Sequence, residues 1–133
     1  MHVHGSCHCG RIRYEAEVDP GRTTVCHCTD CQKLTGTAYR VSVPAREGSF
    51  RLVAGEPSTY IKVADSGARR ALSFCPNCGS PLYAHDADHP TVVGLRVGCI
   101  DEREALVPTT QKWCRSALAW TGDLSTMAGR EAE

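Results

Sequence analysis

The stretch Val25-Cys26-His27-Cys28-Thr29-Asp30-Cys31 decides how the rest of the sequence is read, because it places three thiols in one short loop. Thiolates are soft ligands, and zinc in proteins favours tetrahedral sites built from sulfur and nitrogen. Three sulfurs from one loop can therefore converge on one zinc ion and leave its fourth position to water or a substrate. The loop predicts an open, catalytic metal site on Cys26, Cys28 and Cys31.

Two further cysteine pairs flank this loop, Cys7-His8-Cys9 before it and Cys75-Pro76-Asn77-Cys78 after it. In an extended backbone, positions two apart share a face, so we expect Cys7 and Cys9 to point at one metal. The second pair, followed by Gly79, has the form of a zinc knuckle. Structural zinc sites are closed by four protein ligands, so we predict that Cys7, Cys9, Cys75 and Cys78 hold a structural zinc. The chain is thus expected to bind two zinc ions. A rival partition, in which Cys9 closes the central loop, stays open.

Nine cysteines in a short chain could instead form disulfides. The spacing argues against this, because cysteines one or three positions apart are poorly placed to bridge each other, and the total is odd. No signal-peptide core follows Met1-His2-Val3-His4-Gly5. Metal-bound thiols in a reducing compartment fit better, and we expect a cytoplasmic protein.

Length and charge bound the remaining possibilities. The 133 residues suffice for one domain, and 15 basic residues balance 15 acidic ones. No cluster of Lys and Arg is longer than Arg69-Arg70, so a nucleic-acid surface is disfavoured. No apolar run approaches the ~20 residues of a membrane span. The expected partners are small molecules, with neither nucleic acid nor membrane among them.

Alternating apolar and polar residues predict a mostly β domain. A single helical turn is expected over 32–36, stopped by Gly36. We assign residues 1–120 to the domain and 121–133 to a frayed tail. Trp113 and Trp120 are expected to cover the core, whereas His2 and His4 share a face near a ragged terminus. The predicted strands span residues 11–18, 38–43, 50–53, 59–63, 71–74, 81–85 and 91–98.

The open site suits thiol chemistry. Three thiolates donate strongly to zinc and make it a weaker Lewis acid than neutral histidines would, whereas metal binding lowers the pKa of an incoming thiol. We therefore predict a small thiol as substrate. Hydrolysis would need a general base, for which Asp30 and His27 are candidates. Their plainer interpretations are that Asp30 caps the turn and that His27 faces solvent.

Three motifs carry a family resemblance: Gly5-Ser6-Cys7-His8-Cys9-Gly10, Val25 to Gly36, and Phe74-Cys75-Pro76-Asn77-Cys78-Gly79-Ser80. Their order, spacing and flanking glycines resemble the glutathione-dependent formaldehyde-activating enzyme family, also called the GFA or CENP-V domain, over residues 3–120. The resemblance implies a zinc-stapled Mss4-like β fold and the two zinc sites already assigned. It also implies a carbon-sulfur lyase that, in reverse, joins formaldehyde and glutathione as S-hydroxymethylglutathione. After Pro108 the chain departs from the family pattern: where members often show a histidine before the tryptophan, this chain has Thr110-Gln111-Lys112-Trp113.

Glutathione is an anionic tripeptide, so its pocket should offer cations, and Lys33, Arg40 and Arg13 are candidates. Two other functions stay open: a non-catalytic zinc-binding or partner-binding module, and an enzyme like the methionine sulfoxide reductases that uses Cys114. The bland expectation for Cys114, as for Cys99, is that it packs as a small hydrophobic residue.

Overall fold

Strands make up most of the regular structure, as the alternation predicts. The computed structural model describes residues 1–133 as ten strands, one α-helix and five short 3-10 turns. The helix, α1, spans Thr29–Thr35. The strands are β1 (His2–Ser6), β2 (Arg13–Glu17), β3 (Thr24–Cys26), β4 (Arg40–Pro44), β5 (Arg51–Ala54), β6 (Ser58–Val63), β7 (Arg69–Phe74), β8 (Pro81–Asp86), β9 (Gly94–Arg96) and β10 (Thr110–Lys112).

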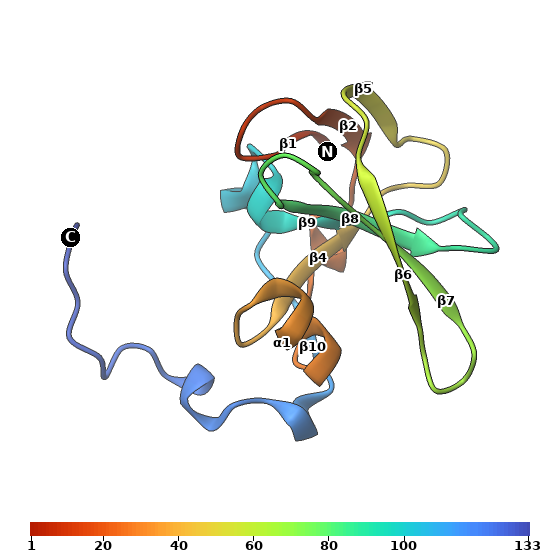
Figure 1. The fold of residues 1–133 in the computed structure, drawn as a ribbon. Helices are drawn as coiled ribbons and strands as arrows, with labels where there is room; N and C mark the ends of the chain where they lie inside the picture. Colours follow the sequence, from red (N-terminus) through yellow and green to blue (C-terminus); the bar gives the residue numbers. More distant parts are fainter.

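The strands form two sheets, one of three strands in the order β1-β2-β5 and one of seven in the order β10-β3-β4-β9-β8-β7-β6 (Figure 1). Every pair is antiparallel except β10 with β3, which is parallel and places Lys112 beside Cys26. The helix α1 lies near β10 and β4, at the end of the large sheet where β3 stops (Figure 1). The prediction of a mostly β single domain is confirmed.

The core lies where the two sheets meet, and three aromatic rings fill it. Tyr14 packs against Phe50 and Tyr83 with ring centroids 5.5 and 6.0 Å apart, and Phe50 and Tyr83 are 4.6 Å apart. Trp113 and Trp120 are each 53% exposed, so the prediction that they cover the core is wrong. The physical reason is that this aromatic trio already closes the core, and the chain after β10 continues outside it as 3-10 turns.

The first strand was missed, and the expectation of a ragged terminus is wrong. Residues His2–Ser6 pair with β2 along their whole length. Val3 and Gly5 are buried between exposed histidines, so the strand alternates as a half-buried strand should. A Cβ added at Gly5 would lie 2.0 Å from the Tyr14 ring, so only glycine fits under this ring.

The other differences concern strand ends. The predicted strand over residues 91–98 is reduced to Gly94–Arg96, because a turn follows Pro90 and a 3-10 turn begins at Val97. Strand β10 was not predicted, since its sequence is polar and exposed. Beyond Gly122 the chain lies in no helix or strand, its side chains are exposed, and it runs away from the body of the molecule (Figure 1).

No helix of the structure combines the length and the apolar character that crossing a bilayer requires.

Candidate metal centres and their cleft

Four cysteines from distant parts of the chain meet at one point. The Sγ atoms of Cys7, Cys9, Cys75 and Cys78 all lie within 4.8 Å of one another. Cys9 Sγ is 3.5 Å from Cys7 Sγ and 3.7 Å from Cys75 Sγ. Four sulfurs at 2.3 Å from a tetrahedral zinc would be about 3.8 Å apart, so these distances fit that metal. The residues Cys7–Cys9 form a turn and not the expected extended segment, but the turn still brings both sulfurs to the shared point.

Hydrogen bonds to sulfur prepare this four-sulfur cluster for a metal. Backbone N–H groups donate to two of its sulfurs, from Ile12 to Cys7 at 3.3 Å and from Cys78 to Cys75 at 3.5 Å. Hydrogen bonding with the Ser80 hydroxyl, followed by backbone bonds, holds the pKa of Cys78 at about 5. Cys7 and Cys75 are buried in the core, whereas Cys78 is half-buried and Cys9 exposed, so the cluster joins the end of the first strand to the large sheet at the edge of the core.

The second cluster comes from a single loop. Cys26 ends β3, Cys28 is the N-cap of α1, and Cys31 lies in its first turn. Their Sγ atoms also lie within 4.8 Å of one another, and no other cysteine, histidine or carboxylate joins the group. Cys9 lies with Cys75 instead, so the rival partition is not what the structure shows. This three-sulfur cluster could hold a metal with one position left over.

The helix itself positions these sulfurs. The backbone N–H of Cys31 donates to Cys28 Sγ at 3.3 Å, so a thiol acts as the N-cap acceptor. The helix ends at Gly36 with φ of 68°, as predicted, but begins three residues earlier than expected. Burial, with neighbouring thiols Cys28 and Cys26 adding to it, raises the pKa of Cys31 to about 12. A divalent cation would supply the charge needed to keep three sulfurs ionised at this point.

Residues 111–116 contact the central cysteine loop on the side away from the cleft. The ring of His27 is 3% exposed, so the expectation that it faces solvent is wrong. Its Nε2 bonds Gln111 Oε1 on β10 at 2.7 Å, and its backbone N–H donates to Lys112 O at 3.0 Å. The Gln32 amide donates to His27 O and to Ser116 O. In the sequence, Gln111 lay within the stretch 110–113 that departs from the family pattern and Gln32 within the central motif, but neither was assigned a role.

Neither proposed base lies in the open site. Asp30 does not cap the turn, because Cys28 does. Its carboxylate instead pairs with Lys62 Nζ on β6 at 2.8 Å. Asp30 and His27 therefore hold the loop through contacts with β6 and β10. Neither residue lines the space in front of the three cysteines.

That space is a cleft of about 670 Å³, and all three cysteines of the loop line it. It is strongly cationic although the chain has zero net charge. Six basic side chains line it and no acidic one does: Arg22, Arg40, Lys62, Arg70, Arg96 and Lys112. Of the three predicted cations, Arg40 is among them, whereas Lys33 and Arg13 are not. The other five basic residues of the cleft come from separate strands and turns, so no basic run in the sequence revealed them.

None of the four arginines in the cleft has an anionic partner, and of the six basic residues only Lys62 pairs with a carboxylate, that of Asp30. Arg96 donates to Ser42 Oγ at 2.9 Å, and burial, with the charge of Arg40 adding to it, lowers its pKa to about 9. Arg40 Nε is buried without a hydrogen-bond partner in the protein. A buried donor without an acceptor is costly, and Arg40 and Arg96 together give the cleft two guanidinium groups that could bind an anion.

The remaining cysteines differ from each other. Cys99 packs against the core and its thiol donates to Pro81 O at 3.2 Å, as expected of a small buried residue. Cys114 is exposed, so the expectation that it packs as a hydrophobic residue is wrong. It lies in a 3-10 turn outside the cleft lining.

The fold and the site define a small, mostly β domain with two unequal cysteine clusters, each of which could hold a metal ion. The model of the glutathione-dependent formaldehyde-activating enzyme family matches residues 2–116. A Halomonas elongata protein named "Putative glutathione-dependent formaldehyde-activating enzyme" is 29% identical over 106 residues, which are 76% of this chain and 67% of the relative. The chain belongs to the glutathione-dependent formaldehyde-activating enzyme family, and the resemblance drawn from its motifs is confirmed.

A solved structure shows the same fold. A Rhodobacter sphaeroides protein, determined by crystallography as a structural genomics target, matches with a TM-score of 0.65 at 22% identity. The match covers 82% of this chain and 99% of that chain. At this identity it supports the arrangement of the strands and nothing further.

Proposed function

We propose that this chain is a zinc-dependent carbon-sulfur lyase-type enzyme that joins glutathione and formaldehyde as S-hydroxymethylglutathione, and also runs that reaction backwards. The observation that carries the proposal is the position of the three-sulfur cluster, which has no fourth protein ligand and opens into a cleft whose only charged lining residues are basic. The family match and the name of the Halomonas elongata relative support the same substrates.

In this proposal the two clusters have different roles. Cys7, Cys9, Cys75 and Cys78 hold a structural zinc, whose four ligands close it to substrates. Cys26, Cys28 and Cys31 hold a second zinc. Zinc bound there would lower the pKa of a thiol that reaches it. The many free thiols also suit a reducing compartment, which supports the cytoplasm as the site of action.

The residues of the cleft bind and orient the thiol. Arg40 and Arg96 offer guanidinium donors to the carboxylates of glutathione. With the tripeptide held, its sulfur is directed to the cysteine end of the cleft. A C–S bond then forms between the glutathione sulfur and the formaldehyde carbon, while the carbonyl π electrons move to oxygen. The thiol loses its proton and the new alkoxide gains one, so the step is neither oxidation nor reduction.

The test measures exchange of labelled formaldehyde into S-hydroxymethylglutathione by NMR, because the adduct also forms slowly without an enzyme. Zinc-loaded protein should accelerate this exchange. Arg40→Gln should weaken glutathione binding about tenfold, since a charged hydrogen bond contributes roughly 1.5 kcal/mol or more. The fold should tolerate this change, because Arg40 Nε makes no hydrogen bond within the protein.

The matched control is Lys33→Gln, which removes one charge from α1 outside the cleft. It should leave glutathione affinity unchanged. A neutral thiol such as 2-mercaptoethanol should bind equally to the parent protein and to Arg40→Gln. Binding of glutathione without accelerated exchange would favour the non-catalytic alternative, and no binding at millimolar glutathione would reject the proposed substrate.

A further inference from the structure

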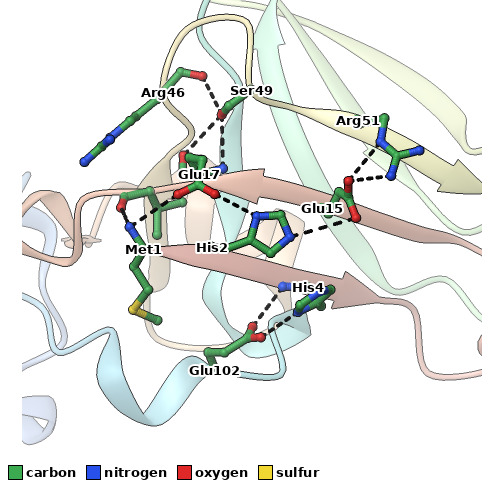
Figure 2. Close-up of polar contacts among 10 residues, drawn as sticks. Met1, His2, His4, Glu15, Glu17, Arg46, Ser49, Arg51 and Glu102 are labelled. Atoms are coloured by element: carbon green, nitrogen blue, oxygen red, sulfur yellow. Dashed lines mark hydrogen bonds and ion pairs between the residues drawn. The ribbon is translucent and has the colours of Figure 1, made fainter.

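A second group of metal-ligand side chains lies on the outer face of the small sheet, away from both cysteine clusters. Figure 2 shows His2 and His4 of β1 beside Glu15 of β2. In the strand register, His4 is opposite Glu15 and His2 is opposite Glu17. One ligand atom from each of His2, His4 and Glu15 lies within 4.8 Å of the others. None of the three lines the cationic cleft.

Both imidazoles are held by carboxylates on the same ring nitrogen. His2 Nδ1 bonds Glu17 Oε1 at 2.7 Å, and His4 Nδ1 bonds Glu102 Oε1 at 2.7 Å (Figure 2). Glu102 Oε2 also accepts the backbone N–H of His4 at 2.8 Å, which fixes this carboxylate in place. Histidines that bind metals almost always donate their other ring N–H to a carboxylate, a carbonyl or water. The pattern leaves Nε2 of each ring available to a ligand.

Glu15 presents its free oxygen to the same place. Its Oε1 pairs with Arg51, so the carboxylate is held from one side, and its Oε2 is 3.9 Å from His2 Nε2. Two ligands at about 2.1 Å from a tetrahedral metal would be about 3.4 Å apart. A shift of about half an ångström would therefore bring His2 Nε2 and Glu15 Oε2 to the separation of two ligands on one metal. Both histidine side chains are about half exposed, so they are free to make this shift.

The surrounding charge favours a cation. Three carboxylates, Glu15, Glu17 and Glu102, face the two rings, against the guanidinium of Arg51 and the amino group of Met1. Sulfur is absent from the group, so its chemistry differs from that of the cysteine clusters. Imidazole with carboxylate suits zinc, nickel, copper and iron more than the hard cations.

We propose that Nε2 of His2, Nε2 of His4 and Oε2 of Glu15 form a third metal site, for a divalent transition metal, with Glu17 and Glu102 as the carboxylates that orient the two rings. Three protein ligands leave further positions to solvent or to a small ligand. The site is independent of the proposed thiol chemistry, because it lies on the other sheet and shares no residue with it.

The test is calorimetric titration of Ni²⁺ into protein whose cysteine clusters are already loaded with zinc, prepared with a C-terminal tag that is then removed. One equivalent of Ni²⁺ should bind beyond the zinc. His2→Ala, His4→Ala and Glu15→Gln should each weaken it at least tenfold. Glu102→Gln should weaken it about tenfold through the orientation of His4, within the range found for such outer ligands.

The control is His89→Ala, which removes an exposed histidine from a distant turn and should change nothing. Histidine NMR gives a second readout: Ni²⁺ should broaden the His2 and His4 ring signals before those of His89. Binding that survives His4→Ala, binding only at millimolar Ni²⁺, or equal loss in His89→Ala would overturn the proposal. Unchanged melting temperatures in all variants confirm that the fold is intact.

Discussion

The two cysteine clusters use the same ligand type and differ in how the chain delivers it. The four-sulfur cluster joins residues 7–9 to residues 75–78 and lies against the core. The three-sulfur cluster comes from residues 26–31 alone and lies at the edge of a cationic cleft. Ligands brought from two distant segments staple the fold, whereas ligands from one loop leave one side of the metal position open.

This difference shows that the three-sulfur cluster is open on one side because of the local geometry of its loop and helix. In the central loop Cys28 caps the helix and Cys31 follows it one turn later, so the helix occupies one side of the cluster. Backbone from β10 supports the loop from behind through His27 and Gln111. The remaining side faces the cleft, where the positive charges gather.

The largest effect should come from the four-sulfur cluster. We expect Cys78→Ser to lose its metal and much of its folded structure, since the binding free energy of a structural zinc is also folding free energy. For a chain of this size, a loss of about 3 kcal/mol lowers the melting temperature by roughly 10 °C. Circular dichroism and metal content check this, with Cys114→Ser, an exposed cysteine, as the control.

Removal of one ligand from the open cluster should act on metal and thiol but not on the fold. Cys28→Ser should lower the metal content by one per chain and abolish glutathione binding. The helix should persist, because serine is a preferred N-cap and can accept the Cys31 N–H that Cys28 accepts now. Unfolding of Cys28→Ser, with loss of both metals, would contradict the division of roles.

Acid should separate the two clusters. The pKa of Cys78 is lowered to about 5, so its contribution is complete above the ordinary thiol pKa and is lost as the pH falls toward 5. The pKa of Cys31 is raised to about 12, so protons compete better for this sulfur at any pH. We expect two release steps in an acid titration followed with a colorimetric chelator, and the metal of the three-sulfur cluster should leave at the higher pH. Release in the opposite order would show that the hydrogen bonds of Ser80 do not set the affinity.

The smallest effect should come from the tail, which contributes to neither cluster. A chain ending at Gly122 should retain its metal content, and its free energy of unfolding should change by no more than about 0.5 kcal/mol, because residues 123–133 are exposed and outside regular structure. The assignment of residues 1–120 as the domain is tested by the same measurement. A large drop in melting temperature of the shortened chain would show that residues 123–133 belong to the folded domain.

The sequence revealed what is local. Cysteine spacing identified both clusters, and alternation identified most strands, because each of these signals lies within a few neighbouring residues. The pairing of β10 with β3 was invisible, since Thr110–Lys112 carries no apolar residue and its partner is 86 positions away by register. The cleft was missed for the same reason: its six basic residues come from five strands and one 3-10 turn, and only the fold gathers them.

The spacing of residue types in the sequence also could not predict how far individual side chains are buried. His27 was expected to face solvent and is enclosed, whereas Trp113 was expected to cover the core and is half exposed. For His27 the deciding contact is with a distant residue, Gln111. For Trp113 the decisive fact is that the rings of Tyr14, Phe50 and Tyr83 already fill the core.

The parallel pairing of β10 with β3 has a consequence for the order of events during synthesis. All four sulfurs of the first cluster have left the ribosome once residue 78 has emerged, so this cluster can form on the nascent chain. The central loop gains its contacts with Gln111 and Ser116 only after those residues have also emerged, later than residue 78. We therefore expect the four-sulfur cluster to form first, and the central loop to acquire its final shape later.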